Sequence, residues 1–124
     1  KRVVLCSGKV YYDLMDALNE TPDETIAVVR VEQLYPIPHE ELSFIFNSYP
    51  ADCEIAWCQE EPRNQGAWYQ TMHNLRADMH EGQPLYYAGR PSSASPAVGY
   101  YSVHIEEQKL LVKDAITLGA GQKY

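Results

Sequence analysis

Residues 54–68 read EIAWCQEEPRNQGAW, and this stretch joins two segments of different periodicity. Its first five residues form an apolar run, which is typical of a buried strand. Apolar residues at helical spacing follow, at Trp68, Met72, Leu75 and Met79. Between the two lie an acid pair, a proline, a base and a glycine, and open α/β sheets expose functional loops where such a strand ends. The stretch therefore predicts a strand, a functional loop and a helix.

Three other apolar runs repeat this arrangement. Residues 2–6, 26–31 and 85–88 have the length and composition of strands, and a helical pattern follows each of them. The helical positions are Val10, Leu14, Ala17 and Leu18, then Leu42, Ile45, Phe46 and Tyr49, then Leu111, Val112, Ala115, Ile116 and Leu118. Strand alternating with helix four times predicts an α/β fold of three layers (αβα) with a mainly parallel sheet.

The chain has 124 residues, the usual size of one domain. We assign residues 1–118 to a single α/β domain and residues 119–124 to a flexible tail. The net charge of −7 repels phosphates, which argues against a nucleic acid or an anionic membrane as the general partner. No apolar run approaches the roughly 18 residues of a membrane span, and no signal peptide is recognisable.

Three cysteines, Cys6, Cys53 and Cys58, make no even disulfide framework. Each lies in or beside an apolar run, where a free cysteine behaves as a small hydrophobic residue. We therefore expect reduced thiols in or near the core, and a reducing compartment: the cytoplasm of a bacterium or the mitochondrial matrix.

Four of the ten lysines and arginines fall at the ends of predicted strands: Lys9, Arg30, Arg63 and Arg90. Because the carboxyl ends of parallel strands meet at one edge of a sheet, we expect these bases to lie together there. Ser7 and Gly8 precede Lys9 at a helix start, where free amides and the helix dipole favour an anion. The pattern predicts a phosphate or a similar anion at this edge.

An alternative is that these bases pair with the acids of the same edge, Glu32, Glu60 and Glu61. Glu60 and Glu61 would serve in acid–base catalysis only if a neighbouring substrate and burial raised the pKa of one of them. The four histidines have no Cys, Asp or Glu partner at a metal-ligand spacing. We therefore predict neither a metal site nor a catalytic pair in this chain.

Four long blocks of the sequence, in order, carry a family resemblance: residues 2–14, 30–36, 59–68 and 87–100, with His104 and Gln108 continuing the last. They resemble the C-terminal domain of the first, decarboxylating component of the 2-oxoglutarate dehydrogenase complex, from residue 2 to about residue 118. A sister family that acts on 2-oxoadipate favours a different helix start after its Glu-Glu-Pro motif. The resemblance implies a fold similar to the C-terminal domain of transketolase.

The resemblance also implies a parent enzyme that uses thiamine diphosphate and magnesium to decarboxylate 2-oxoglutarate. The succinyl group then passes to the lipoyl arm of the second component, dihydrolipoyl succinyltransferase. In that family two preceding domains bind the cofactor. This chain has no Gly-Asp-Gly…Asn-type pattern for the diphosphate and metal. We therefore expect the chain alone to bind neither of them and to lack decarboxylase activity.

In that family the C-terminal domain supports the homodimer and contributes a regulatory site for AMP or acetyl-CoA. The residues of this chain that the resemblance assigns to the anion site are Arg2, Ser7, Lys9, Arg30 and Arg90. Glu60 and Arg63 are assigned to the same edge by position only. The alternative is a purely structural dimerisation domain, which uses its many tyrosines and tryptophans at interfaces and binds no ligand.

Overall fold

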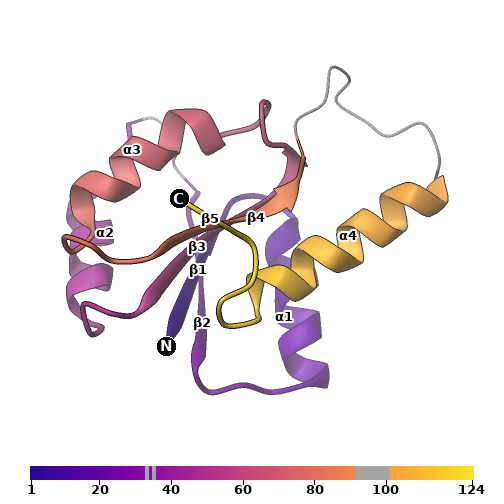
Figure 1. The fold of residues 1–124 in the computed structure, drawn as a ribbon, viewed down its shortest axis with the longest axis horizontal. Coiled ribbons are helices and arrows are strands. Elements are labelled where there is room, and N and C mark those ends of the chain that lie inside the picture. Colours follow the sequence, from indigo (N-terminus) through magenta and orange to yellow (C-terminus); the bar gives the residue numbers. More distant parts are fainter. Residues whose placement is uncertain (33, 35, 92–100) are drawn as a thin grey trace.

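The computed structural model describes residues 1–32, 34, 36–91 and 101–124, and strands alternate with helices along them (Figure 1). The strands are β1 (Arg2–Cys6), β2 (Ile26–Arg30), β3 (Glu54–Pro62), β4 (Leu85–Arg90) and β5 (Gln122–Lys123). The helices are α1 (Val10–Glu20), α2 (His39–Asn47), α3 (Trp68–Asp78) and α4 (Tyr101–Ala115). The four predicted strand–helix units are confirmed.

The strands form one sheet in the order β2-β1-β3-β4-β5. The first four run parallel, and β5 runs antiparallel to β4. α2 and α3 cover one face of the sheet, and α1 and α4 cover the other (Figure 1). The predicted three-layer αβα fold with a mainly parallel sheet is confirmed. Within the described residues, no helix has both the length and the apolar character that a bilayer span requires.

Successive side chains of the central strands enter two separate cores, because a strand alternates its faces. On β1, Val3 and Leu5 pack under α2 and α3, whereas Val4 and Cys6 pack under α1 and α4. β3 continues both cores with Ile55 and Trp57 on one face and Ala56 and Cys58 on the other. Both faces of these strands are therefore apolar, which explains their nearly continuous hydrophobic sequence.

β3 is longer than the predicted run of residues 54–58, because it continues to Pro62. Its partner β4 also continues, to Arg90, and the register between them shifts after Gln59. The extension is polar, so hydrophobic periodicity gave no sign of it. Part of the predicted functional loop is therefore an irregular end of the strand.

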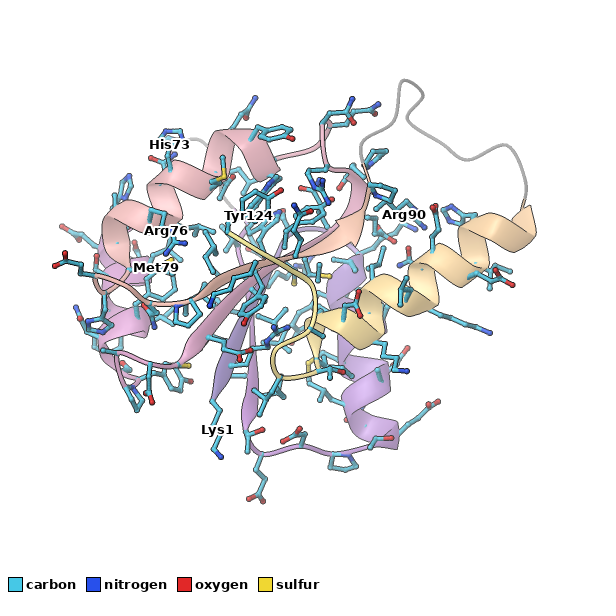
Figure 2. All side chains as sticks on the ribbon, viewed as in Figure 1. Lys1, His73, Arg76, Met79, Arg90 and Tyr124 are labelled. Carbon is cyan, nitrogen blue, oxygen red and sulfur yellow. The ribbon has the colours of Figure 1, made fainter. Side chains whose placement is uncertain are left out.

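The chain end also differs from the sequence-based expectation. The sequence predicts a flexible tail over residues 119–124, whereas in the structure Gln122 and Lys123 form β5 along the outer edge of β4. Tyr124 donates its backbone N–H to Leu85 at 2.8 Å, and its ring lies 5.0 Å from that of Trp68 (Figure 2). This pairing covers the otherwise open edge of β4. Hydrophobic periodicity could not predict it, because Gln122 and Lys123 are polar and exposed. Leu118, predicted to face inward, lies beyond α4 and is 43% exposed.

Two glycines test different constraints of this fold. A Cβ added to Gly89 on β4 would lie 2.5 Å from Tyr87 Oη and 2.9 Å from the backbone oxygen of Gln59. Gly8 has a φ of 83° but open space around it. We expect Gly89→Ala to lower the free energy of unfolding by about 3 kcal/mol through overpacking. Gly8→Ala should lower it by only about 1 kcal/mol through backbone strain. Urea unfolding of both variants measures the difference, and the reverse order would contradict this account.

Candidate functional site

The carboxyl ends of the four parallel strands meet at one edge of the sheet, as predicted. Cys6, at the end of β1, pairs with Arg30 on β2 and with Cys58 on β3. Pro62 pairs with Arg90 where β3 and β4 end. Two of the predicted bases, Arg30 and Arg90, are thus held at this edge by strand pairing alone.

Arg90 is the buried centre of the edge, with only 6% of its side chain exposed. Its Nη1 donates to the backbone oxygen of Glu60, and its Nη2 donates to Gln108 Oε1 at 2.9 Å and to the backbone oxygen of His104 at 3.2 Å. The Glu107 carboxylate lies 3.3 Å from Nε, close enough for an ion pair, although the two atoms are not aligned for a hydrogen bond. Arg90 therefore fastens α4 to the ends of β3 and β4 (Figure 2). We call Arg90, Glu60, His104, Glu107 and Gln108 the Arg90 network.

Gln108 connects this network to α1 and to an exposed base. Its Nε2 donates to Glu60 Oε1 at 2.9 Å and to Asp13 Oδ2 at 2.7 Å. The same Glu60 oxygen lies 3.5 Å from Lys9 Nζ, and the Lys9 side chain is 82% exposed. An ion pair this exposed contributes at most about 1 kcal/mol. The ammonium of Lys9 is therefore available to another anion at little cost.

Sequence reasoning did not select His104, Glu107 and Gln108 as site residues. Glu107 and Gln108 follow His104 by three and four residues, which places them on one face of a helix, and the family resemblance links His104 and Gln108 to the block that contains Arg90. Their partner Arg90 stands 14 residues before His104. Only the tertiary fold shows that α4 returns to the end of β4.

The start of α1 is open to an anion. Lys9 occupies the cap position and no side chain caps the helix. Within the described residues, the amides of Gly8, Lys9 and Val10 donate no hydrogen bond, and the hydroxyl of half-buried Ser7 makes none. An anion at this point would accept from these groups and gain about 0.3–1 kcal/mol from the helix dipole.

Arg30 stands beside the same helix start. Its guanidinium lies over the rings of Tyr11 and Tyr12, 5.6 and 5.5 Å from their centres. Its polar contacts are long: 3.4 Å to Tyr12 Oη and 3.8 Å to the Glu32 carboxylate. The aromatic rings position the cation, and an incoming anion can replace these weak contacts. Ser7, Lys9 and Arg30 thus all lie at or beside the first turn of α1, with Lys9 on the side of β3 and Arg30 on the side of β2.

The backbone of Arg63 lies at this edge, but its charged guanidinium group does not. Its N–H donates to the backbone oxygen of Arg90 at 3.0 Å. Its guanidinium lies 5.1 Å from the centre of the Tyr87 ring, which belongs to the core under α2 and α3. The charge of Arg63 is therefore on the opposite face of the sheet from α1 and the Arg90 network.

Arg2 lies at the opposite end of the sheet, at the first position of β1, and is completely buried. Its Nε donates to Glu54 at 2.8 Å, its Nη1 donates to the backbone oxygens of Asp114 and Ala115, and its Nη2 donates to that of Ala120. The structure therefore does not bring Arg2 together with Lys9, Arg30 and Arg90. Its donors are already used to hold the end of α4.

Comparison with known proteins assigns the chain to a family. Residues 1–116 match the family described as 2-oxoglutarate dehydrogenase C-terminal. The chain belongs to this family. It is 54% identical over 115 residues to a 2-oxoglutarate dehydrogenase E1 component of Cupriavidus necator, and 52% identical over 117 residues to that of Haemophilus influenzae. These alignments cover 93% and 94% of this chain but only 12% of each relative, so the chain spans about an eighth of their length.

In this member of the 2-oxoglutarate dehydrogenase C-terminal family, residues 59–68 are organised by the buried amide of Gln59. Its Oε1 accepts hydrogen bonds from Trp57 Nε1 at 3.0 Å and from the backbone N–H of Trp68 at 3.1 Å. Its Nε2 lies within 3.1 Å of three backbone oxygens, those of Glu61, Pro62 and Gln65. One side chain thus joins β3, the turn and the start of α3. The sequence motif that predicted a functional loop acts here to set the shape of the edge.

The three cysteines are free and buried, as predicted. Burial raises the pKa of Cys6 to about 11, and burial also raises the pKa of Cys58. Both thiols stay protonated at neutral pH and are poor nucleophiles. Among the described residues, no group of three or more His, Cys, Asp and Glu side chains could hold a metal ion. The exposed polar groups at this edge include the Lys9 ammonium, the Arg30 guanidinium and the unused amides at the start of α1.

The role of Gln59 can be tested by Gln59→Glu, which keeps the shape but places a carboxylate against backbone oxygens. We expect a loss of about 3 kcal/mol or more in the free energy of unfolding at pH 7. Burial would raise the pKa of the introduced carboxyl in the folded state. Below about pH 4.3 it is protonated in both states, so the loss should shrink there. Urea unfolding at pH 7 and pH 4, relative to the unchanged chain, measures both effects. Gln70→Glu on exposed α3 is the control, and an equal loss there would contradict the assignment.

A structural role for Arg2 predicts a large effect of Arg2→Met. The change leaves the Glu54 carboxylate without its base, so we expect a loss of about 3–5 kcal/mol. Arg30→Met, the same substitution at an exposed position on the neighbouring strand, should cost at most about 1 kcal/mol. Adding Glu54→Gln to Arg2→Met should recover part of the loss, because no unpaired charge remains. Denaturant unfolding would refute this role if the two single variants were equally destabilised.

Proposed function

We propose that this chain is the C-terminal domain of the E1 component of a 2-oxoglutarate dehydrogenase. That enzyme decarboxylates 2-oxoglutarate with thiamine diphosphate and magnesium, and it passes the succinyl group to the lipoyl arm of dihydrolipoyl succinyltransferase. The family match and the names of the relatives support this proposal. The relatives are bacterial, so we place the enzyme in the bacterial cytoplasm.

The residues of this domain do not fit the cofactor. The described part of the chain offers no cluster of acidic, histidine or cysteine side chains for magnesium. The open helix start at Lys9 could contact a phosphate, but the nearby acids Glu60 and Asp13 belong to no described group of three ligands that could hold the metal. We therefore place the thiamine-binding residues in the rest of the subunit and expect no decarboxylation by these 124 residues alone.

Within the subunit, we propose that the first turn of α1 forms a regulatory site for the phosphate groups of AMP or acetyl-CoA. The observation that carries this proposal is the juxtaposition of unused amides, an exposed lysine and a ring-stacked arginine at one helix start. Each charge-assisted hydrogen bond to phosphate contributes about 1.5–3 kcal/mol, more than the weak ion pairs that it would replace. A local anion site can thus exist on a chain whose mean charge is negative.

Arg90 takes an indirect part in this proposal. Its side chain is buried, and both of its terminal nitrogens donate hydrogen bonds within the Arg90 network. It holds α4 and Glu60 beside Lys9, and so it keeps the edge in a fixed shape. The Nε atom of Arg90 could contact an anion only if the neighbouring Glu107 carboxylate moved away.

The second candidate, a dimerisation role, is favoured by exposed aromatic side chains. Tyr12, Phe44 and Tyr69 are 56%, 76% and 50% exposed. Aromatic residues are enriched in protein interfaces, where a partner would cover them. The two roles are compatible at Phe44 and Tyr69, which lie on α2 and α3 and away from Lys9, whereas Tyr12 lies beside Arg30 at the proposed anion site.

Titration of this chain with AMP and with acetyl-CoA, followed by amide NMR, tests the anion site. We expect shifts at Gly8, Lys9 and Val10, and Lys9→Ala or Arg30→Ala should weaken binding about tenfold. The control is Lys113→Ala, which removes an equal charge from the last turn of α4, away from the start of α1. A flat titration at millimolar ligand, or an equal effect of the control, would leave only the structural role.

A further inference from the structure

A long groove between α1 and α4 has no role in the proposed function. It has a volume of about 990 Å³ and lies on the face of the sheet opposite α2 and α3. Its apolar floor consists of partly exposed side chains: Ala17, Leu18, Ile105, Val112 and Ile116. Three of them, Leu18, Val112 and Ile116, also pack against the core beneath. We call this feature the α1–α4 groove.

The width of the groove is fixed without any partner. Arg2 holds the carboxyl end of α4 through the backbone oxygens of Asp114 and Ala115. Arg90 holds the other end of the helix through His104 and Gln108. The hydrogen bond from Gln108 to Asp13 joins the two helices directly. The groove is therefore preformed, which lowers the cost of ordering on binding.

The two rims of the groove carry opposite charges. The rim formed by α1 and the turn after it is acidic, with Asp13, Asp16 and Glu20 on the helix and Asp23 beyond it. The α4 rim has two bases, Lys109 and Lys113. Asp16 and Glu20 are exposed, and neither forms an ion pair with another described residue. The acids outnumber the bases along the groove, as they do in the whole chain, so its charge favours a basic occupant.

We propose that the α1–α4 groove docks an amphipathic helix, whose apolar side chains fill the floor while its lysines or arginines face the acidic rim of α1. A third helix is the natural occupant of a groove between two helices, with its apolar residues at i, i+3, i+4 and i+7. The chain spans only 12–13% of the length of its relatives, so we place this helix in the remainder of the same subunit. That location rests on the proposed function, whereas the chemistry of the groove does not.

The chemistry is tested on this chain with two synthetic helical peptides of one leucine pattern, one with lysine and one with glutamate at the flanking positions. Calorimetry should show that the lysine peptide binds and that the glutamate peptide binds at least about tenfold more weakly. Amide NMR should place the shifts on α1 and α4. Equal binding of the two peptides, or shifts elsewhere, would overturn the proposal.

Matched variants separate docking from nonspecific attraction to an acidic protein. Leu18→Asp adds a negative charge inside the groove, so docking should weaken about tenfold although electrostatic attraction grows. Phe44→Asp adds the same charge on α2, where the side chain is 76% exposed, and should not weaken binding. If Leu18→Asp fails to fold, the exposed pair Asp16→Lys and Glu20→Lys replaces it and should reverse the preference between the two peptides. Unchanged preference in that variant would refute the acidic rim.

The source of the helix is tested in the full-length subunit. A photo-crosslinking amino acid at Ile116 should capture a Lys/Arg-rich helical segment of the same polypeptide, identified by mass spectrometry. The same probe at Phe44 is the control and should not capture that segment. Capture of no segment of the subunit would overturn this source. That result would not affect the peptide-binding test of the groove or the NMR test of the anion site at Lys9, which are separate measurements.

Discussion

β1 lies between β2 and β3, and all five of its side chains are completely buried. Since helices cover both faces, a polar group on this strand cannot reach water and must find its partners inside the protein. Arg2, at the first position, meets this constraint with Glu54 and three backbone oxygens near the end of the chain. The same constraint places the exposed charges, such as Lys9 and Arg30, at the ends of strands. The burial of the sheet thus decides which bases are structural and which are available to a ligand.

α4 depends on two buried arginines from opposite ends of the sheet. Arg2 binds the backbone oxygens at its carboxyl end, where a cation also suits the helix dipole. Arg90 binds His104 and Gln108 near its other end. Through Gln108 the second arginine also reaches Glu60 and so sets the surroundings of Lys9. One fixed helix therefore shapes both the edge that carries Lys9 and the groove beside α1.

Hydrophobic periodicity predicted the elements that bury apolar faces and missed those that do not. The runs at Arg2–Cys6 and Glu54–Cys58, and the helical spacing at Leu42 and Phe46, lie in the cores as expected. The polar extension of β3 to Pro62 and the two-residue strand β5 gave no such signal, because pairing with β4 and not burial creates them. The predicted gathering of bases at the carboxyl edge holds for Lys9, Arg30 and Arg90. It holds for Arg63 only through its backbone, and it does not hold for Arg2.

The sequence by itself determined the fold class, the order of the elements and the edge at which charge gathers. These follow from local patterns and from the rule that the carboxyl ends of parallel strands meet. Only the tertiary structure decided the roles of Gln59 and Glu60 within residues 59–68. Gln59 became the buried link between β3 and α3, while Glu60 became a partner of Lys9 and Gln108. The reason is physical. The role of a polar side chain depends on which distant groups the fold places within hydrogen-bond distance, and the residues next to it in the sequence do not reveal those groups.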